Sequence, residues 1–378
     1  MGKKATPRTK GSGGKDKRSA DSKDKKPRAK KSSTSTDTLH GGPKTCVTRT
    51  RSISNTSVMG ENQQLVTDFV KATLDKTPEM LREEFAKHKR AADKDKTVAF
   101  LNNQPKNRYK DVPCLDNDRV LLQGGDSDYI HANYVSTPKD QRRFICCQAP
   151  IKDTLADHWK MIVQQDVESI LMLCNYIEGP IEKCAAYFPT KKEPEMTFGP
   201  FTIKLIKLEK LKLPDCETSA KIMASSLEVK QDGVKVKDVK HYHWVDWPDR
   251  GVPPIDQAPI RLLNLITTTT KPILVHCSAG VGRTGAVVLV QYALESIEKG
   301  QPVQQMDTLM LKVREQRANS VQNDAQYVYV HMLLLNYFQK EGLIVEPELQ
   351  NKFKDTFTPA YNKFAKAAEV KLSAPAKK

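Results

Sequence analysis

The sequence predicts an α/β (α+β) protein built on a twisted mixed β-sheet flanked by helices. Short branched apolar runs at residues 169–174 and 272–277 have the composition of buried strands. Three later runs alternate apolar with polar residues, as half-buried antiparallel strands do. Other segments space apolar residues three and four apart, which is typical of amphipathic helices. Strands and helices in this order indicate one sheet covered by helices.

The elements follow from these patterns in chain order. Strands are predicted for 119–122, 129–135, 143–148, 169–174, 201–211, 220–230, 234–245 and 272–277. Helices are predicted for 65–74, 80–89, 154–165, 258–266, 284–299, 306–317 and 324–339. A short helix near 363–371 is a further candidate.

Charge and composition divide the 378-residue chain into three parts. Residues 1–51 carry 16 Lys and Arg against 4 Asp and Glu, so they hold most of the formal charge of +16. We expect a disordered basic arm over residues 1–59, because it is too polar to offset its ordering entropy. A folded domain is expected over 60–342, followed by a polar, partly helical tail over 343–378.

The eight cysteines show no C-x-x-C pair and no zinc-type spacing, so we expect free thiols in a reducing compartment. The Lys-rich start lacks an apolar stretch, and no run has the length of a membrane span. We therefore expect a cytoplasmic protein, with the nucleus as an alternative, and no structural metal.

The basic arm leaves several interpretations open. Gly2 and Thr6 fit the loose N-myristoylation pattern, which together with the basic patch would attach the arm to an anionic membrane. Lys3 and Pro7 argue against acylation. The stretch KKPRAKK could serve nuclear import or contact nucleic acid or acidic proteins. A solvated tail without a partner is the simplest interpretation.

The stretch ILVHCSAGVGRTG carries the clearest chemistry. A buried strand ends at His276 and Cys277, and Arg283 opens the next helix. Backbone N–H groups at a helix N-terminus bind anions, and a thiol placed there loses its proton more readily. Arg283 can hold two phosphate oxygens at once. The pattern predicts a phosphoryl-transfer site with a cysteine nucleophile, although a structural cysteine before a turn would show the same C-x₅-R spacing.

From His276 to Gly285 the chain resembles the phosphate loop of protein-tyrosine phosphatases, and the resemblance extends over about residues 61–342. It implies that Cys277 attacks phosphorus while Arg283 and the loop amides hold the phosphate. The amide-bearing residues are Ser278, Ala279, Gly280, Val281 and Gly282. Thr284 would bond the leaving thiolate, and His276 would tune the loop from behind. No metal or cofactor is expected, because these groups stabilise the charge.

Two further motifs match the same family. WVDWPDRGVP resembles a mobile loop whose Asp249 protonates the leaving tyrosyl oxygen. KNRYKDV resembles the phosphotyrosine-recognition loop, in which Tyr109 stacks beside the substrate ring and Asp111 accepts hydrogen bonds from the substrate backbone. Lys183 matches a lysine that contacts the closed Asp loop. Glu178 matches an acid that orients the loop arginine, or it is a solvated loop charge.

QRANSVQNDAQYVYV resembles the family's Gln loop, in which Gln322 positions the water of the second step. Gln326 is a second matching glutamine, and Arg317 keeps the expected spacing. Asn319 stands where the family commonly has Gly, so we expect a narrower pocket mouth. Asn323 replaces the usual Thr. Residues 128–134 resemble a structural signature, to which we assign packing and no catalytic role.

The resemblance implies hydrolysis of phosphotyrosine in proteins through a cysteinyl-phosphate, by a monomer whose partners are phosphotyrosine-containing proteins. A catalytically inert phosphotyrosine-binding relative is one alternative. A dual-specificity or phosphoinositide phosphatase is another, although the loop interior lacks lysines and the Tyr109 motif is present. Both features favour phosphotyrosine.

Overall fold

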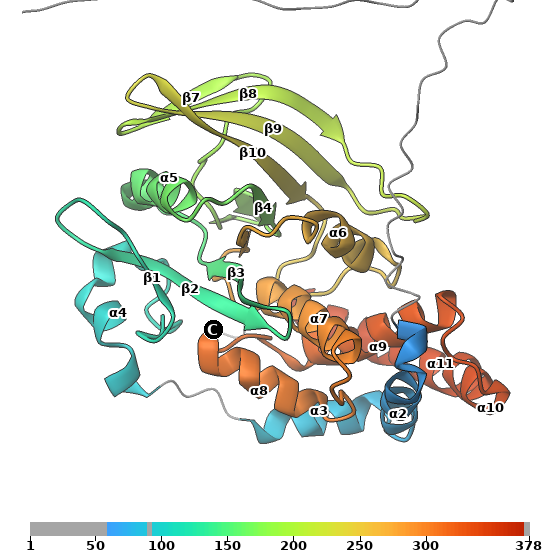
Figure 1. The fold of residues 1–378 in the computed structure, drawn as a ribbon. Helices are drawn as coiled ribbons and strands as arrows, with labels where there is room; N and C mark the ends of the chain where they lie inside the picture. Colours follow the sequence, from blue (N-terminus) through green and yellow to red (C-terminus); the bar gives the residue numbers. More distant parts are fainter. Residues whose placement is uncertain (1–58, 89–92, 374–378) are drawn as a thin grey trace, which may run out of the picture. The chain divides into compact units, whose positions relative to one another are not determined.

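The protein is described by a computed structural model that covers residues 59–88 and 93–373 (Figure 1). Its main sheet has nine strands in the order β1-β2-β3-β11-β4-β10-β9-β8-β7. At its centre β11 (Ile273–His276) runs parallel to β3 (Asp140–Cys147) and to β4 (Ser169–Met172). The strands toward both edges are antiparallel. The predicted mixed sheet with flanking helices is confirmed.

The first part of the chain supplies two helices that pack against other helices, and then one edge of the sheet. α2 (Gln63–Leu74) and α3 (Pro78–Lys87) form where apolar residues recur with helical spacing. The Thr77 side chain accepts a hydrogen bond from the backbone N–H of Met80 (3.2 Å) and so caps α3. After the short α4 (Val98–Asn102), β1 (Arg119–Leu121) and β2 (Tyr129–Thr137) pair in antiparallel fashion.

The middle of the chain forms the other edge. After α5 (Leu155–Gln164) and β4, the hairpin β5–β6 (Ile177–Glu178, Ile181–Glu182) stands as a separate two-stranded sheet. β7 (Glu195–Phe198), β8 (Phe201–Lys210), β9 (Ile222–Gln231) and β10 (Val234–Trp244) then pair in sequence as antiparallel neighbours. The alternating pattern had predicted the last three. β5, β6 and β7 were not predicted, because they lack the continuous apolar runs that marked the equally short β1, β4 and β11.

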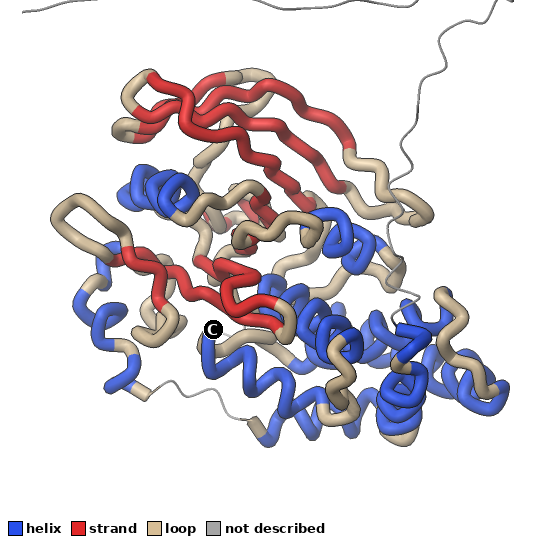
Figure 2. The backbone as a smooth tube through the Cα atoms, in the orientation of Figure 1, coloured by secondary structure: helices blue, strands red, loops and turns tan. Residues whose placement is uncertain are grey.

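The last third is helical apart from β11. It contains α6 (Ala258–Ile266), α7 (Arg283–Glu298), α8 (Met306–Gln316), α9 (Asp324–Lys340), α10 (Pro347–Asn351), a π-helix (Lys352–Phe357) and α11 (Thr358–Ser373). α7 and α9 are buried on nearly every face, which explains their continuous apolar runs. Figure 2 shows α7 and α8 on the side of β2 and β3, while most of β8 and β9 lies apart from them.

The segment after Leu343 is more deeply integrated than a polar tail. From Leu349 onward, five apolar side chains are buried in the core cluster, namely Leu349, Phe353, Phe357, Tyr361 and Phe364. They recur at spacings of three to four residues, so the helices bury one face. Residues 358–373 form a helix longer than the predicted short one. The domain boundaries at 60 and 342 stay predictions.

The predicted disorder of the basic arm lies outside the described residues, apart from Met59, which is buried. The acylation pattern at Gly2 and the basic stretch at 25–31 lie outside them as well. Among the residues described, none of the helices is both long and apolar enough to cross a membrane.

Candidate active site

The phosphate-loop sequence lies at the carboxyl end of β11, in the middle of the sheet, and leads directly into α7. Cys277 and Arg283 are both buried. Gly280 has φ of +69°, and a Cβ there would lie 1.9 Å from the carbonyl oxygen of Cys147. Glycine is therefore required at this position. The N–H of Ala149 also donates to the carbonyl of Ser278 (3.0 Å), which fixes the loop against β3.

The loop favours the thiolate form of Cys277. Burial alone would raise the pKa of this thiol, but the Arg283 charge, the Thr284 hydroxyl and the Gly280 amide outweigh it, so the pKa lies below the usual value. The Gly280 N–H donates to the sulfur at 3.3 Å. The buried thiol of Cys146 lacks this compensation, and burial raises its pKa to about 12. The structure thus distinguishes Cys277 chemically from a merely structural cysteine.

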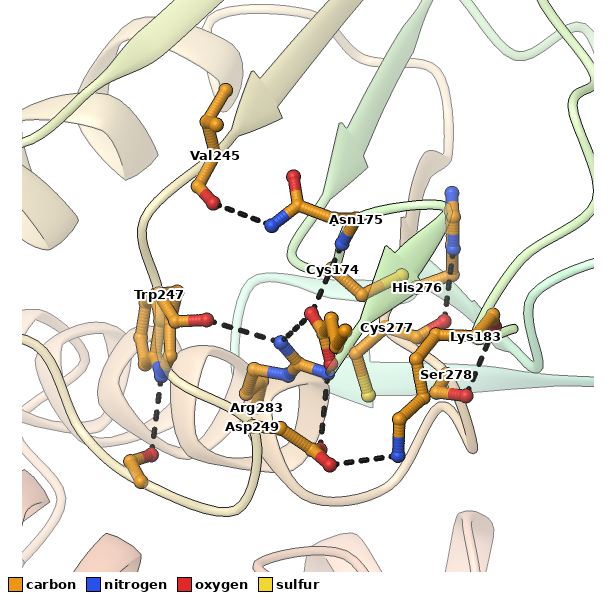
Figure 3. Close-up of polar contacts among 12 residues, drawn as sticks. Cys174, Asn175, Lys183, Val245, Trp247, Asp249, His276, Cys277, Ser278 and Arg283 are labelled. Atoms are coloured by element: carbon orange, nitrogen blue, oxygen red, sulfur yellow. Dashed lines mark hydrogen bonds and ion pairs between the residues drawn. The ribbon is translucent and has the colours of Figure 1, made fainter. Parts of the chain in front are cut away.

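Arg283 is fixed by three neighbours (Figure 3). Its Nη1 and Nη2 donate to the two carboxylate oxygens of Glu178, at 2.6 and 2.9 Å. Nη1 also donates to the carbonyl of Trp247 (3.1 Å), and Nη2 to Oδ1 of Asp249 (3.3 Å). The Glu178 side chain is 11% exposed, so it is not a solvated loop charge. The arrangement instead holds the guanidinium in one orientation.

Asp249 reaches the phosphate loop from the loop that follows β10. Besides the contact with Arg283, its Oδ2 accepts a hydrogen bond from Nζ of Lys183 at 2.7 Å. The indole N–H of Trp247 donates to the carbonyl of Gly251 (3.3 Å) and closes the turn around the acid. The predicted pairing of Lys183 with the acidic loop is therefore present in the structure, and it places Asp249 beside Cys277 and Arg283.

Tyr109 is held beside the phosphate loop by hydrogen bonds of its own side chain and of the neighbouring residue. Its hydroxyl lies 2.8 Å from Oγ of Ser278, which donates to the carbonyl of Lys183 (2.9 Å). The neighbouring Arg108 donates from its side chain to the carbonyls of Ala149 and Pro150. These bonds hold the ring beside the phosphate loop. Asp111 is exposed at the rim of the same pocket.

The Gln loop is attached directly to the phosphate loop. The N–H of Val321 donates to the carbonyl of Val281 (2.9 Å). Gln322 and Gln326 lie over Gly282, because a Cβ on that glycine would be 2.9 Å from Oε1 of Gln322 and 3.1 Å from Nε2 of Gln326. The side chain of Gln326 accepts a hydrogen bond from the N–H of Gln322 (2.8 Å). Both amides therefore face the site.

A single cavity of about 160 Å³ unites most of the predicted residues. Its walls include Tyr109, Asp111, Lys183, Asp249, Cys277, Ser278, Ala279, Arg283, Gln322 and Gln326, together with Val112, Ile181 and Arg250. Thr284, His276, Gly280, Val281 and Gly282 are not on this wall: they form the buried floor of the loop and its connections. Asn319 is not on the wall either, so the structure does not show the narrowing expected of it.

Two groups of supporting contacts were not predicted, although the sequence had pointed to Arg317 and His276 themselves. Arg317 is fully buried and donates to the carbonyl of Gly280 (3.1 Å), to Oδ1 of Asn133 (2.9 Å) and to Nδ1 of His131 (3.1 Å). Burial, with the Arg317 charge, lowers the pKa of His131 to about 3, so this histidine is neutral. Polar residues inside the apolar strand β2 were the available signal, since buried amides need partners.

The second group lies behind the loop. The hydroxyl of Tyr187 is 2.7 Å from Nε2 of His276 and 2.7 Å from Nε2 of His241. His276 also places Nδ1 at 3.1 Å from the carbonyl of Cys277. This series of hydrogen bonds connects the backbone of Cys277 to β10 and fixes the orientation of the His276 ring. Within the described residues, no group of three or more His, Cys, Asp or Glu side chains is placed to hold a metal.

Comparison with known proteins agrees with this geometry. The protein-tyrosine phosphatase family model matches residues 103–336. The human receptor-type tyrosine-protein phosphatase C is 35% identical over 245 residues, which are 63% of this chain and 18% of that protein. The mouse tyrosine-protein phosphatase non-receptor type 2 is 32% identical over 251 residues, covering 64% of this chain and 59% of that protein. The chain thus spans less than two thirds of either relative.

A solved structure of PTPN18 in complex with HER2-pY1248 phosphor-peptides is 31% identical, with a TM-score of 0.57 over 64% of this chain and 91% of that one. The match supports the same sheet and helix arrangement in both proteins. Since the family match spans more than half of the chain and includes the loop from His276 to Gly285, this protein belongs to the protein-tyrosine phosphatase family.

Proposed function

We propose that this protein hydrolyses phosphotyrosine in proteins through a cysteinyl-phosphate intermediate. The observation that carries the proposal is the convergence of Cys277, Arg283, Asp249 and Tyr109 on one cavity of about 160 Å³. A nucleophile, a fixed cation, a carboxyl group and an aromatic wall then surround the space that a substrate phosphate would occupy. Membership of the family supports the reaction class.

In the first step the sulfur of Cys277 attacks phosphorus. The S–P bond forms as the P–O bond to tyrosine breaks, and Asp249 gives its proton to the leaving oxygen. Arg283 holds two phosphate oxygens, and the loop amides hold the charge that develops. Glu178 keeps the guanidinium in place through both of its oxygens. A lowered thiol pKa supports attack at neutral pH.

In the second step a water molecule attacks the phosphorus of the cysteinyl-phosphate. The S–P bond breaks, its electron pair returns to sulfur, and Asp249 accepts the proton of the water. Gln322 positions this water, with Gln326 holding the Gln322 backbone (2.8 Å). Thr284 and the Gly280 amide stabilise the thiolate that leaves. Inorganic phosphate is then released.

Selectivity for phosphotyrosine follows from the depth of the cavity, which the Tyr109 side chain sets. Tyr109 lies above Ser278, so a phosphate reaches Cys277 only on a long, flat side chain. Two solved structures similar to this chain are those of PTPN18 in complex with HER2 phosphor-peptides, which supports phosphotyrosine proteins as partners. We propose a catalytic domain over residues 60–342, acting as a monomer in the cytoplasm or nucleus.

The proposal is tested by turnover of a phosphotyrosine peptide and of an aryl phosphate, with Cys277→Ser as the matched control. We expect activity in the wild type and none in the variant. Equal, background-level activity in both would establish the inert, phosphotyrosine-binding alternative. A phosphoserine peptide and a phosphoinositide serve as competing substrates, and faster hydrolysis of either would overturn the phosphotyrosine assignment.

Substrate trapping identifies the partner class. Asp249→Ala removes the proton donor, so kcat should fall by about 10²- to 10⁴-fold while phosphotyrosine proteins still bind. Enrichment of phosphotyrosine proteins by this variant, relative to a Cys277/Arg283 double variant, is the expected result. No enrichment over that double variant would contradict the proposal.

A further inference from the structure

Asn323 connects two loops of the site through the two ends of one side chain. It lies at the N-cap of α9, where its Oδ1 accepts a hydrogen bond from the N–H of Gln326 at 2.9 Å. Its Nδ2 donates to the carbonyl of Arg250 at 2.7 Å. Arg250 directly follows Asp249. The side chain therefore joins the start of α9, where the site glutamines lie, to the loop that carries the acid.

The other hydrogen bonds that hold the Asp loop come from a different side, while the Trp247 ring of this loop packs edge-on against Tyr329 of α9, with ring centroids 6.0 Å apart. Arg283 binds the carbonyl of Trp247 and the Asp249 carboxylate, and Lys183 binds the same carboxylate. These bonds start from the phosphate loop and from the segment after β6. Among the hydrogen bonds found between described residues, the bond from Asn323 to Arg250 joins the N-terminus of α9 to this loop.

The backbone conformation of Arg250 indicates that a hydrogen-bond partner holds its carbonyl in place. Its φ is 58°, a left-handed conformation that is costly for a residue with a side chain. Such conformations persist where the surroundings fix them. The hydrogen bond from Asn323 is a specific interaction that this turn makes possible, and it requires the Asp loop to lie where Asp249 meets Arg283.

We propose that Asn323 is a positioning residue that holds the Asp loop over the phosphate loop and couples it to the Gln loop. The inference rests on the proposed function, since it assigns Asn323 a part in placing the acid. A threonine, the usual residue of the family here, has one side-chain oxygen for both contacts. The amide separates them: Oδ1 caps the helix, and Nδ2 reaches the loop.

The test uses a variant that removes one contact and keeps the other. In Asn323→Asp the carboxylate still accepts from the N–H of Gln326 and suits a helix N-terminus, but it has no N–H for the Arg250 carbonyl. Asn323→Thr is the second variant, with a single oxygen. The kcat/KM is measured for aryl phosphates whose leaving groups range from weakly to strongly acidic phenols.

We expect Asn323→Asp to lower kcat/KM about threefold to tenfold for the weakly acidic phenols, as for the loss of one hydrogen bond. The decrease should be less than about twofold for strongly acidic phenols, because these leave without a proton from Asp249. With Asp249→Asn as background, the same change should have no further leaving-group effect. An equal decrease for all substrates, or none, would overturn the proposal.

A second measurement does not depend on turnover. Amide hydrogen exchange of residues 247–253 should be faster in Asn323→Asp than in the wild type, while the melting temperature stays unchanged because the cap is kept. Unchanged exchange in this loop would contradict the role of Asn323. If the wild type itself shows no turnover, the proposed function fails, and the exchange comparison still decides whether Asn323 holds the loop.

Discussion

Burial and ionisation oppose each other at Cys277, and its neighbours decide the outcome. Burial raises the pKa of a thiol, whereas the Arg283 charge, the Thr284 hydroxyl and the Gly280 amide lower it further than burial raises it. Because the folded pKa lies below the unfolded one, ionisation stabilises the fold at pH values above the unfolded pKa. That stabilisation is lost as the pH falls through the folded pKa.

Thr284→Ala should raise the pKa of Cys277, because it removes a hydroxyl that favours the thiolate and has no other hydrogen-bond partner among the described residues. The measurement is the rate of alkylation by iodoacetamide against pH, followed by mass spectrometry. The midpoint should move to higher pH. Cys277→Ser identifies the reacting thiol, and an unchanged midpoint in Thr284→Ala would contradict the assignment.

Glu178 is the second residue whose surroundings define its role. Glu178→Gln removes the charge that pairs with buried Arg283, which should cost about 3 kcal/mol of unfolding free energy. A guanidinium that shifts by about 1 Å should lower kcat/KM by about 10²-fold. Denaturant unfolding and turnover of an aryl phosphate measure the two effects.

The control comes from the same hairpin. The Glu182 side chain is 54% exposed and lies 3.8 Å from Arg108. Because this carboxylate lies largely in solvent, the pair contributes about 1 kcal/mol or less, so Glu182→Gln should change little. Equal effects of the two substitutions would mean that Glu178 does not position Arg283.

At the scale of elements, the site depends on close contact between α7 and the Gln loop. Gly285 lies in the first turn of α7, and a Cβ there would be 2.3 Å from the backbone N of Val321 and 3.0 Å from the backbone of Ser320. The absence of a side chain therefore allows the Gln loop to reach the phosphate loop. The bond from the N–H of Val321 to the Val281 carbonyl depends on this approach.

Gly285→Ala should displace the Gln loop and lower stability by about 1–3 kcal/mol, as overpacking does. Since Gln322 moves with the loop, hydrolysis of the cysteinyl-phosphate should slow more than its formation. Rapid-quench measurement should then show that the phosphoenzyme accumulates. Gly60→Ala is the control, because a Cβ at Gly60 meets nothing within 4 Å. A phosphoenzyme level equal to that of the wild type would refute this reasoning.

At the scale of the whole molecule, the helices after Leu343 complete the core. Phe353 and Phe357 of the π-helix and Tyr361 and Phe364 of α11 are buried in it. α11 contacts α3 and α9, which are distant in sequence. A cavity of about 920 Å³, lined by residues of α9, α11 and the Asp loop, lies beside this packing. The C-terminal helices therefore stabilise the region that supports the site.

Phe357→Ala should lower the free energy of unfolding by about 3–5 kcal/mol, because it leaves a cavity where a buried ring was. Thr356→Ala, on the exposed side of the same helix, should change it by less than about 0.5 kcal/mol. Thermal or denaturant unfolding measures both. A small effect at Phe357 would show that this segment is not part of the cooperative core.

Most long elements were predictable because their periods extend over many residues. The antiparallel strands β8, β9 and β10 and the helices from Arg283 to Lys340 show this, since each lies where its sequence pattern predicted it. The two-residue strands β5 and β6 show no period, yet they present Glu178 and Ile181. The buried face after Leu343 was missed because mostly polar and charged residues separate its aromatic side chains.

The residues of the site also divide into those that the sequence predicted and those that it did not. The residues from His276 to Thr284 are adjacent in sequence, and the strand, loop and helix together set their local geometry. The amino-acid order alone therefore predicted that the Cys277 thiol, the loop amides and Arg283 lie around one anion-binding site. The contacts of Arg317 with His131 and Asn133 join segments almost 200 residues apart. No local pattern encodes such pairs, because they depend on how β2 and α8 pack together.

The sequence by itself determined the mixed sheet, the anion-binding loop and the family, since all three depend on short-range spacing and motifs. The tertiary structure decided that Glu178 fixes Arg283, that Asn319 does not line the cavity and that Asn323 bonds to Arg250. Each of these depends on distances between separate loops. Such distances arise when the hydrophobic core brings the strands and helices together, and side-chain chemistry then determines which groups meet.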